Sequence, residues 1–169
     1  FNLYQLRQAQ PDSLKIYFYF YYMALTPSEN IALGSKATPF ELLDTVSDYV
    51  KSLNELKGEK GTVILFICNH CPFVIHINPA LSALAIKYQA MGINFIAISS
   101  NNAEAYPQDG PAYMRAVAKK ENYTFPYLYD ETQEVAKTYG ATCTPDIYLY
   151  NADLQLAYHG QLDDSRPGN

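Results

Sequence analysis

Hydrophobic residues are arranged in two ways along the chain, as short unbroken runs and as positions that recur every three or four residues. The runs "TVILFIC" (62–68) and "INFIAISS" (93–100) are apolar and rich in β-branched residues, a composition typical of strands covered on both faces. Between them, from Pro72 to about Met91, apolar residues recur at helical spacing. This strand–helix–strand order predicts parallel strands joined by a right-handed crossover.

The segments on either side extend this pattern. Alternating polar and apolar residues in "FELLD" (40–44) and "VSDYVKSLNEL" (46–56) predict an N-terminal hairpin. The later segments are predicted, in order, as a loop (101–111), a helix to about Glu121, an extended stretch (125–130), a short helix (132–140) and a second hairpin (146–151 with 154–160). The expected fold is α/β, with a mixed central sheet flanked by helices and an N-terminal β-hairpin extension.

The chain divides into two parts by composition. Residues 1–22 contain a basic residue followed by a short, tyrosine-rich apolar run, which faintly resembles a secretion signal. Tyrosine is a poor filler for such a signal and no clear cleavage site follows, so we interpret this part as an atypical N-terminal extension. Residues 23–169 are predicted to form one domain. Because a last helix should cover one sheet face after the final strand, we expect this domain to be truncated at its C-terminus.

Charge and composition narrow the function classes. Of the 169 residues, 49% are hydrophobic and 17% are charged, which is an ordinary globular composition. The net charge of −5 gives no bulk attraction for nucleic acid or for an anionic membrane. No apolar stretch reaches the roughly 18 residues that span a bilayer. We therefore expect neither nucleic acid nor membrane as a partner, and take the cytoplasm as the default location.

The stretch "ICNHCPFV" (67–74) carries the candidate chemistry. A pair of cysteines with two residues between them, after a strand and before a helix, is typical of a redox-active disulfide. We expect Cys68 at the helix N-terminus, where unpaired amides and the helix dipole favour a thiolate. Cys71 would lie one turn further on and release a mixed disulfide. The intervening Asn69 and His70 would tune the reduction potential.

Other interpretations of the pair stay open. Two cysteines at this spacing are also half of a zinc site, but such a site needs four ligands and there is no second pair. Cys143, His76 or His159 would have to complete it. The cysteines could also be packed thiols without chemistry. The strand before and the helix after favour the redox interpretation, so no metal is predicted.

The stretch "ATCTPDIYLY" (141–150) strengthens that interpretation. A Thr–Pro dipeptide just before a strand is a place for a cis peptide bond, here between Thr144 and Pro145. Such a loop would bring the Thr144 backbone beside the cysteines, where it could pair with an extended substrate. Cys143 would then lie near the pair, as a candidate third thiol or as a small packed residue.

Together these stretches resemble the thioredoxin superfamily, in its peroxiredoxin-like and TlpA-like branch of AhpC/TSA type. The resemblance implies a thioredoxin-like fold, with Cys68 as the nucleophile, Cys71 as the resolving thiol and Pro145 as the cis proline. It also implies a closing helix beyond Asn169. The segments that carry the resemblance are "GTVILFICNHCPFV" (61–74), "INFIAISSNN" (93–102), "PYLYDETQEVAKTYGATCTPDIYLY" (126–150) and "YHGQLDDSRPGN" (158–169).

Two departures from the family pattern bear on function. Peroxiredoxins carry a threonine or serine three residues before the reactive cysteine and a proline four residues earlier, where this chain has Leu65 and Gly61. Thioredoxin has Gly-Pro between its cysteines, where this chain has Asn-His. The predicted function is thiol–disulfide exchange with a protein disulfide or dithiol, or with a thiol reductant, and it needs no organic cofactor. The alternatives are a thiol peroxidase acting through Cys68 and a non-enzymatic metal-binding or redox-sensing module. The oligomeric state and the direction of electron flow stay open.

Overall fold

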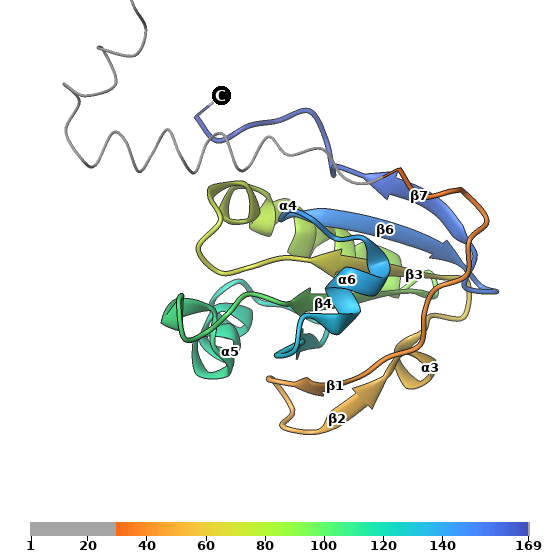
Figure 1. Ribbon diagram of the computed structural model, residues 1–169. Coiled ribbons are helices and arrows are strands. Elements are labelled where there is room, and N and C mark those ends of the chain that lie inside the picture. The colour runs from red at the N-terminus through yellow and green to blue at the C-terminus, as the bar shows by residue number, and fades with distance from the viewer. Residues whose placement is uncertain (1–29, 169) are drawn as a thin grey trace, which may run out of the picture.

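The computed structural model describes residues 30–168, so the N-terminal extension predicted for residues 1–22 lies outside the described residues. Figure 1 shows the described part as one sheet with helices packed on it. Its strands are β1 (Glu41–Asp44), β2 (Val50–Ser52), β3 (Gly61–Phe66), β4 (Ile93–Ser99), β5 (Tyr127–Tyr129), β6 (Asp146–Asn151) and β7 (Leu156–Gly160). Its helices are α3 (Leu53–Leu56), α4 (Pro72–Gln89), α5 (Pro111–Lys120) and α6 (Glu134–Tyr139), with a 3₁₀ turn at Pro107–Asp109.

The sheet is mixed, as the sequence predicts. Its strand order is β2-β1-β5-β4-β3-β6-β7. Strands β3, β4 and β5 are parallel neighbours. β1 pairs antiparallel with β5 on one side of this centre and β6 with β3 on the other, and β7 pairs antiparallel with β6. The carboxyl ends of β3, β4 and β5 therefore meet at one edge of the sheet. In open α/β sheets this edge is where ligands bind.

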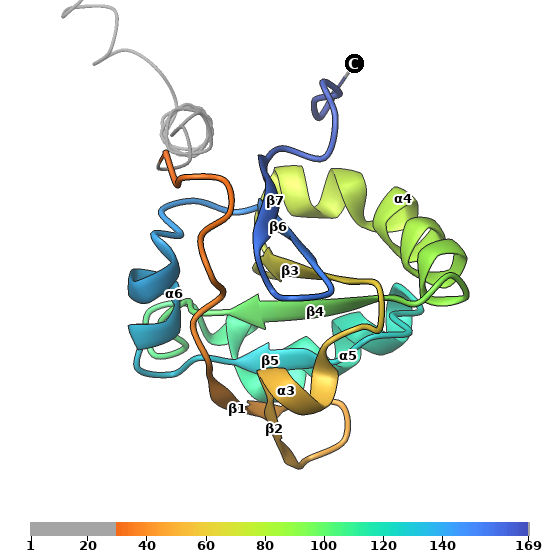
Figure 2. The same cartoon turned by 90° about the vertical axis from the view of Figure 1, so that its right-hand side faces the viewer.

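Helices cover both faces of the sheet and divide the core in two. Figure 2 shows α4 and α5 on one side of the strands and α6 on the other. Side chains alternate along β3: Leu65 joins the core under α4 and α5, whereas Ile64 and Phe66 join the core under α6. This alternation explains the unbroken apolar run in the sequence, because both faces of the central strands are covered.

The first hairpin differs in its second half from the prediction. β1 and β2 pair as expected, but only Val50–Ser52 of the stretch 46–56 is extended. The stretch then turns into α3, because Ser52 caps the helix: its hydroxyl accepts from the Glu55 amide, and the Glu55 carboxylate accepts from the Ser52 amide. The spacing of Ser52 and Glu55 is a capping-box signal that outweighs the alternation.

The stretch predicted only as extended, 125–130, contains the short strand β5, which links the hairpin to the central strands. α4 follows the prediction closely and begins with Pro72 in its first turn. Within residues 30–168, no helix is both long enough and apolar enough to cross a membrane.

Candidate active site

The two cysteines lie in the turn that joins β3 to α4, at the carboxyl edge of the parallel strands. Both are buried. The prediction that Cys68 stands at the helix N-terminus is wrong: Cys71 is the N-cap residue of α4, and Cys68 lies three residues earlier, in the turn. The reason is Pro72, whose fixed backbone angle suits the first helical position, so that the helix begins after the pair instead of within it.

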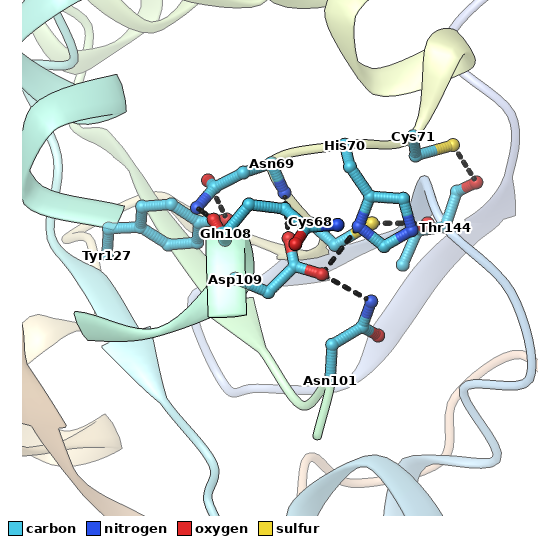
Figure 3. A network of polar contacts seen from close by, with 9 residues as sticks. All are labelled: Cys68, Asn69, His70, Cys71, Asn101, Gln108, Asp109, Tyr127 and Thr144. Atoms are coloured by element: carbon cyan, nitrogen blue, oxygen red, sulfur yellow. Dashed lines mark hydrogen bonds and ion pairs between the residues drawn. The ribbon is translucent and has the colours of Figure 1, made fainter. Parts of the chain in front are cut away.

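Thr144 contacts both sulfur atoms. Its hydroxyl lies 3.4 Å from the Cys68 sulfur, and its carbonyl oxygen accepts a hydrogen bond from the Cys71 thiol at 3.2 Å. Figure 3 shows these two contacts on either side of the same residue. The peptide bond from Thr144 to Pro145 is cis, as predicted. The loop before β6 therefore lies directly beside the cysteines, although more than 70 residues separate them in sequence.

The two thiols ionise as a pair. The Cys68 thiol donates a hydrogen bond to the Cys71 sulfur, which lowers the pKa of Cys71 to about 6, and the amides of Phe73 and Val74 lower it further against the effect of burial. The same hydrogen bond, with burial and the charge of Asp109, raises the pKa of Cys68. The pair thus loses its first proton easily and its second with difficulty, as two coupled acids do.

Asp109 anchors the turn between the cysteines. Its carboxylate is completely buried and accepts hydrogen bonds from the Asn69 amide at 2.7 Å and from the Asn101 side chain at 2.9 Å. The His70 ring nitrogen Nδ1 lies 2.6 Å from Asp109 Oδ2, the oxygen that also accepts from Asn101. Figure 3 shows these partners converging on Asp109. Three donors around one carboxylate compensate for its removal from water.

The two residues between the cysteines are both held by side-chain contacts. His70 stacks on Tyr106, with ring centres 5.0 Å apart and planes 15° apart, and keeps 21% of its side chain exposed. The Asn69 side chain donates to the Gln108 carbonyl at 2.6 Å and accepts from the Tyr127 hydroxyl at 3.1 Å. The 3₁₀ turn therefore fixes the conformation of the cysteine turn.

The metal alternative has part of a ligand set here. Among the described residues, one atom each of Cys68, His70 and Asp109 lie within 4.8 Å of one another. A structural zinc site needs four ligands, and neither Cys143, His76 nor His159 belongs to this group. The Asp109 oxygens already accept the hydrogen bonds described above. The contacts of this cluster are therefore those of a hydrogen-bond network.

A recess opens beside the cysteine pair, on the α6 side of the sheet. We call it the α6 recess. Its volume is about 470 Å³. The residues that line it include Cys68, Cys71, Thr144, Lys137 of α6, and Cys143. The structure therefore places the candidate third thiol in the same space as the pair.

All of the predicted site residues come together, but the sequence analysis missed the residues that hold them. The missed residues, Asn101, Tyr106, Gln108 and Asp109, lie in the segment predicted only as a loop. A signal for them existed. This loop follows β4, and loops that follow parallel strands meet at the carboxyl edge of the sheet.

Comparisons with known proteins agree with this geometry. A protein from Geobacillus kaustophilus, described as an uncharacterized conserved protein, is 52% identical, with a TM-score of 0.83 over 85% of this chain and 76% of its own. The thioredoxin domain of a thiol–disulfide oxidoreductase from Bacteroides vulgatus is 18% identical, with a TM-score of 0.67 over 80% of this chain and 92% of its own. The fold is therefore thioredoxin-like.

Sequence comparison gives the family. The thiol–disulfide oxidoreductase ResA of Bacillus thuringiensis is 25% identical over 128 residues, which are 76% of this chain and 69% of ResA. The AhpC/TSA family model matches residues 33–159, a range that includes both cysteines and the Thr144–Pro145 loop. The chain belongs to the AhpC/TSA family.

Proposed function

We propose that the protein is a thiol–disulfide oxidoreductase in which Cys68 attacks a substrate disulfide and Cys71 resolves the mixed disulfide. The observation that carries this proposal is the contact of Thr144 with both buried sulfurs, at 3.4 Å from Cys68 and 3.2 Å from Cys71. Coupling between the two thiols also lowers the pKa of Cys71 to about 6. A thiolate present at neutral pH is the form that attacks disulfides.

Thr144 supports Cys68 as the attacking sulfur. When the shared proton lies on Cys71, that thiol donates to the Thr144 carbonyl at 3.2 Å. Cys68 is then the thiolate, to which the Thr144 hydroxyl, 3.4 Å away, can donate. The N-cap position of Cys71 stabilises the opposite arrangement, with the charge on Cys71. Both arrangements contain one thiolate and one thiol, so moving a single proton converts one into the other.

The exchange balances as follows. The Cys68 thiolate attacks one sulfur of the substrate, a Cys68–substrate disulfide forms, and the other substrate sulfur leaves as a thiolate. The first substrate thiolate takes up the proton of Cys71. The Cys71 thiolate then attacks the Cys68 sulfur and expels the second substrate thiolate. The pair has given two electrons to the substrate and becomes a disulfide, and its shared proton leaves with one of the products. A dithiol reductant returns the pair to its starting state.

A trapping experiment tests the assignment. The reduced Cys71→Ser variant, treated with bis(2-hydroxyethyl) disulfide, should accumulate a mixed disulfide on Cys68, which peptide mapping by mass spectrometry would locate. The Cys68→Ser variant should form its adduct at least tenfold more slowly. Faster trapping on Cys71 would reverse the two roles. A wild-type protein that is not oxidised at all would contradict the exchange function.

The same maps test Cys143. We expect the oxidised wild-type protein to contain a Cys68–Cys71 disulfide and Cys143 as a thiol. A disulfide that includes Cys143 would make it a resolving thiol in place of Cys71.

The peroxidase alternative has a weaker basis in the site. Leu65, at the position where peroxiredoxins carry a hydroxyl, is completely buried in β3 within the core under α4 and α5. It offers no hydrogen bond to a peroxide. We therefore favour disulfide over hydroperoxide as the oxidant of Cys68.

A further inference from the structure

The α6 recess has the size of a small-molecule site and lies at the right place for one. Its volume of about 470 Å³ is within the range of ligand pockets, roughly 300–1,000 Å³. Phe66 and Ile98, which line it, belong to the last residues of β3 and β4. The recess is thus at the carboxyl edge of the parallel strands, where α/β sheets bind ligands. It is also continuous with both reactive sulfurs.

The lining of the recess combines apolar walls with a positive charge. Phe66, Ile98 and Ala136 supply apolar surface, and Lys137 supplies an ammonium group. Among the described residues that line the recess there is no aspartate and no glutamate, although the chain as a whole has a net charge of −5. A ligand with an aliphatic body and a negative group matches this lining better than a cationic ligand does.

Two buried carboxylates that bond to residues lining the recess are already occupied. Asp109 accepts the three contacts described above. Asp130 accepts hydrogen bonds from the Ser100 hydroxyl at 2.8 Å and from the Ala136 amide at 2.9 Å. Both carboxylates are completely buried behind the residues that line the recess. Their hydrogen bonds compensate much of their charge, which leaves Lys137 as the charged group on the surface of the recess.

Lys137 is able to exchange partners. Its ammonium group lies 2.8 Å from the Glu134 carboxylate, and the two side chains are 62% and 70% exposed. An exposed pair three residues apart on a helix contributes little stability. A carboxylate entering the recess can therefore compete with Glu134 for the lysine.

We propose that the α6 recess binds small disulfides that carry a carboxylate, and that Lys137 recognises this group while Cys68 attacks the sulfur. This inference rests on the exchange function proposed above and names its substrate class. The shared-proton pair plus the disulfide gives the Cys68–Cys71 disulfide, one small thiol and one small thiolate, so that electrons, protons and charge balance.

Three disulfides of similar size provide the test: 3,3′-dithiodipropionate with two carboxylates, bis(2-hydroxyethyl) disulfide with none, and cystamine with two ammonium groups. Pre-reduced protein is mixed with each disulfide, and the reaction is quenched at intervals with N-ethylmaleimide. Mass spectrometry then gives the fraction of protein oxidised at each time, and from it a second-order rate constant. Comparing a variant with the wild type for each disulfide cancels the intrinsic reactivity of the three reagents.

The Lys137→Gln variant should react about three- to fivefold more slowly with dithiodipropionate, the range that an exposed ion pair supports. Its rate with the neutral disulfide should stay unchanged, and its rate with cystamine should not fall. Lys120→Gln is the matched control. Lys120 is an exposed lysine of α5 paired with Glu121 at 3.0 Å, and its loss changes the net charge equally. Glu134→Gln removes the competing carboxylate and should raise the rate constant with dithiodipropionate.

The possible outcomes distinguish recognition by Lys137 from the thiol–disulfide exchange on which it rests. Equal losses in Lys137→Gln and Lys120→Gln would mean that only overall charge matters and would overturn the recess as a recognition site. If Lys137→Gln lowered the rate equally with the neutral and the dianionic disulfide, that result would also overturn it. Failure of the wild-type protein to react with any of the three reagents would instead contradict the exchange function itself.

Discussion

Two histidine–aspartate pairs lie in the described part of the molecule, and they have similar geometry but different surroundings. At the cysteine turn, His70 Nδ1 and Asp109 are 2.6 Å apart. At the start of β6, directly after Pro145, Asp146 lies 2.9 Å from Nε2 of His159 in β7. Both aspartates are completely buried, but the His159 side chain is only 6% exposed, against 21% for His70.

The neighbours of each pair explain the difference. Asp146 also accepts from the Tyr148 hydroxyl at 2.9 Å, and His159 stacks on the Tyr148 ring with centres 4.1 Å apart. Burial and the nearby charge of Asp146 raise the pKa of Tyr148, which keeps its hydroxyl as a donor. Asp109 instead lies close to the Cys68 sulfur, and its charge is one of the causes that raise the pKa of Cys68. One pair therefore stabilises a fixed strand contact, and the other borders a group that changes its charge.

The ionisation of the cysteines is the largest expected difference between the two regions. The pKa of Cys71 falls from an ordinary 9.0 to about 6. Half of the cysteine pairs should then carry a thiolate at pH 6, against about one ordinary thiol in a thousand. Because the pKa is lowered, the thiolate persists from alkaline pH down to about pH 6 and is lost below it. Alkylation by iodoacetamide, followed against pH with peptide mapping, should show a step near pH 6. A single step above pH 8 would contradict the shared proton.

Asp146→Asn should lower the stability of the fold more than Asp109→Asn does. The asparagine keeps one acceptor oxygen and presents an amide group to the other neighbour, so one buried hydrogen bond, to His159 or to Tyr148, is lost, while Tyr148 keeps its contact with the Tyr139 carbonyl. We expect a loss of about 3 kcal/mol in the free energy of unfolding, measured by urea denaturation. The rate of reaction with bis(2-hydroxyethyl) disulfide, corrected for the folded fraction, should stay within about twofold of the wild type. A much larger loss of rate would show that the two regions are coupled.

Asp109→Asn should act on the cysteines instead. The charge of Asp109 is one of the causes that raise the pKa of Cys68, after the hydrogen bond to Cys71 and burial. In a Cys71→Ser background, which removes the coupling, the asparagine should lower the alkylation midpoint of Cys68 by about half a pH unit, a threefold change in thiolate. Asn101→Ala is the control, since it removes a donor to Asp109 and leaves the charge in place. Equal shifts in both variants would assign the effect to loosening of the loop.

The sequence predicts the central fold well. It predicts poorly which residues hold the cysteine turn in place, and the reason is physical. The apolar runs of β3 and β4, the helical spacing after Pro72 and the Thr144–Pro145 dipeptide are local signals, and each led to the correct element. The hydrogen bonds between Asp109 and Asn69, and between Asn69 and Tyr127, join residues 40 and 58 positions apart. No local pattern marks them, because an aspartate in a loop is most often solvated. The helix start at Pro72 was predicted correctly, but the position of Cys68 relative to it was not, since Cys71 is the N-cap residue.

The ion pair of Arg115 and Asp48 is largely exposed and should give the smallest effect. The two residues join α5 to the hairpin. Arg115 also donates to the Thr45 carbonyl at 2.6 Å, so the arginine keeps a partner when the aspartate is changed. Asp48 has a positive backbone φ of 64°, which asparagine also tolerates. Asp48→Asn should therefore change the free energy of unfolding by less than about 0.5 kcal/mol, measured by the same urea denaturation as Asp146→Asn. A loss close to that of Asp146→Asn would show that this contact, and not burial, determines what an ion pair contributes here.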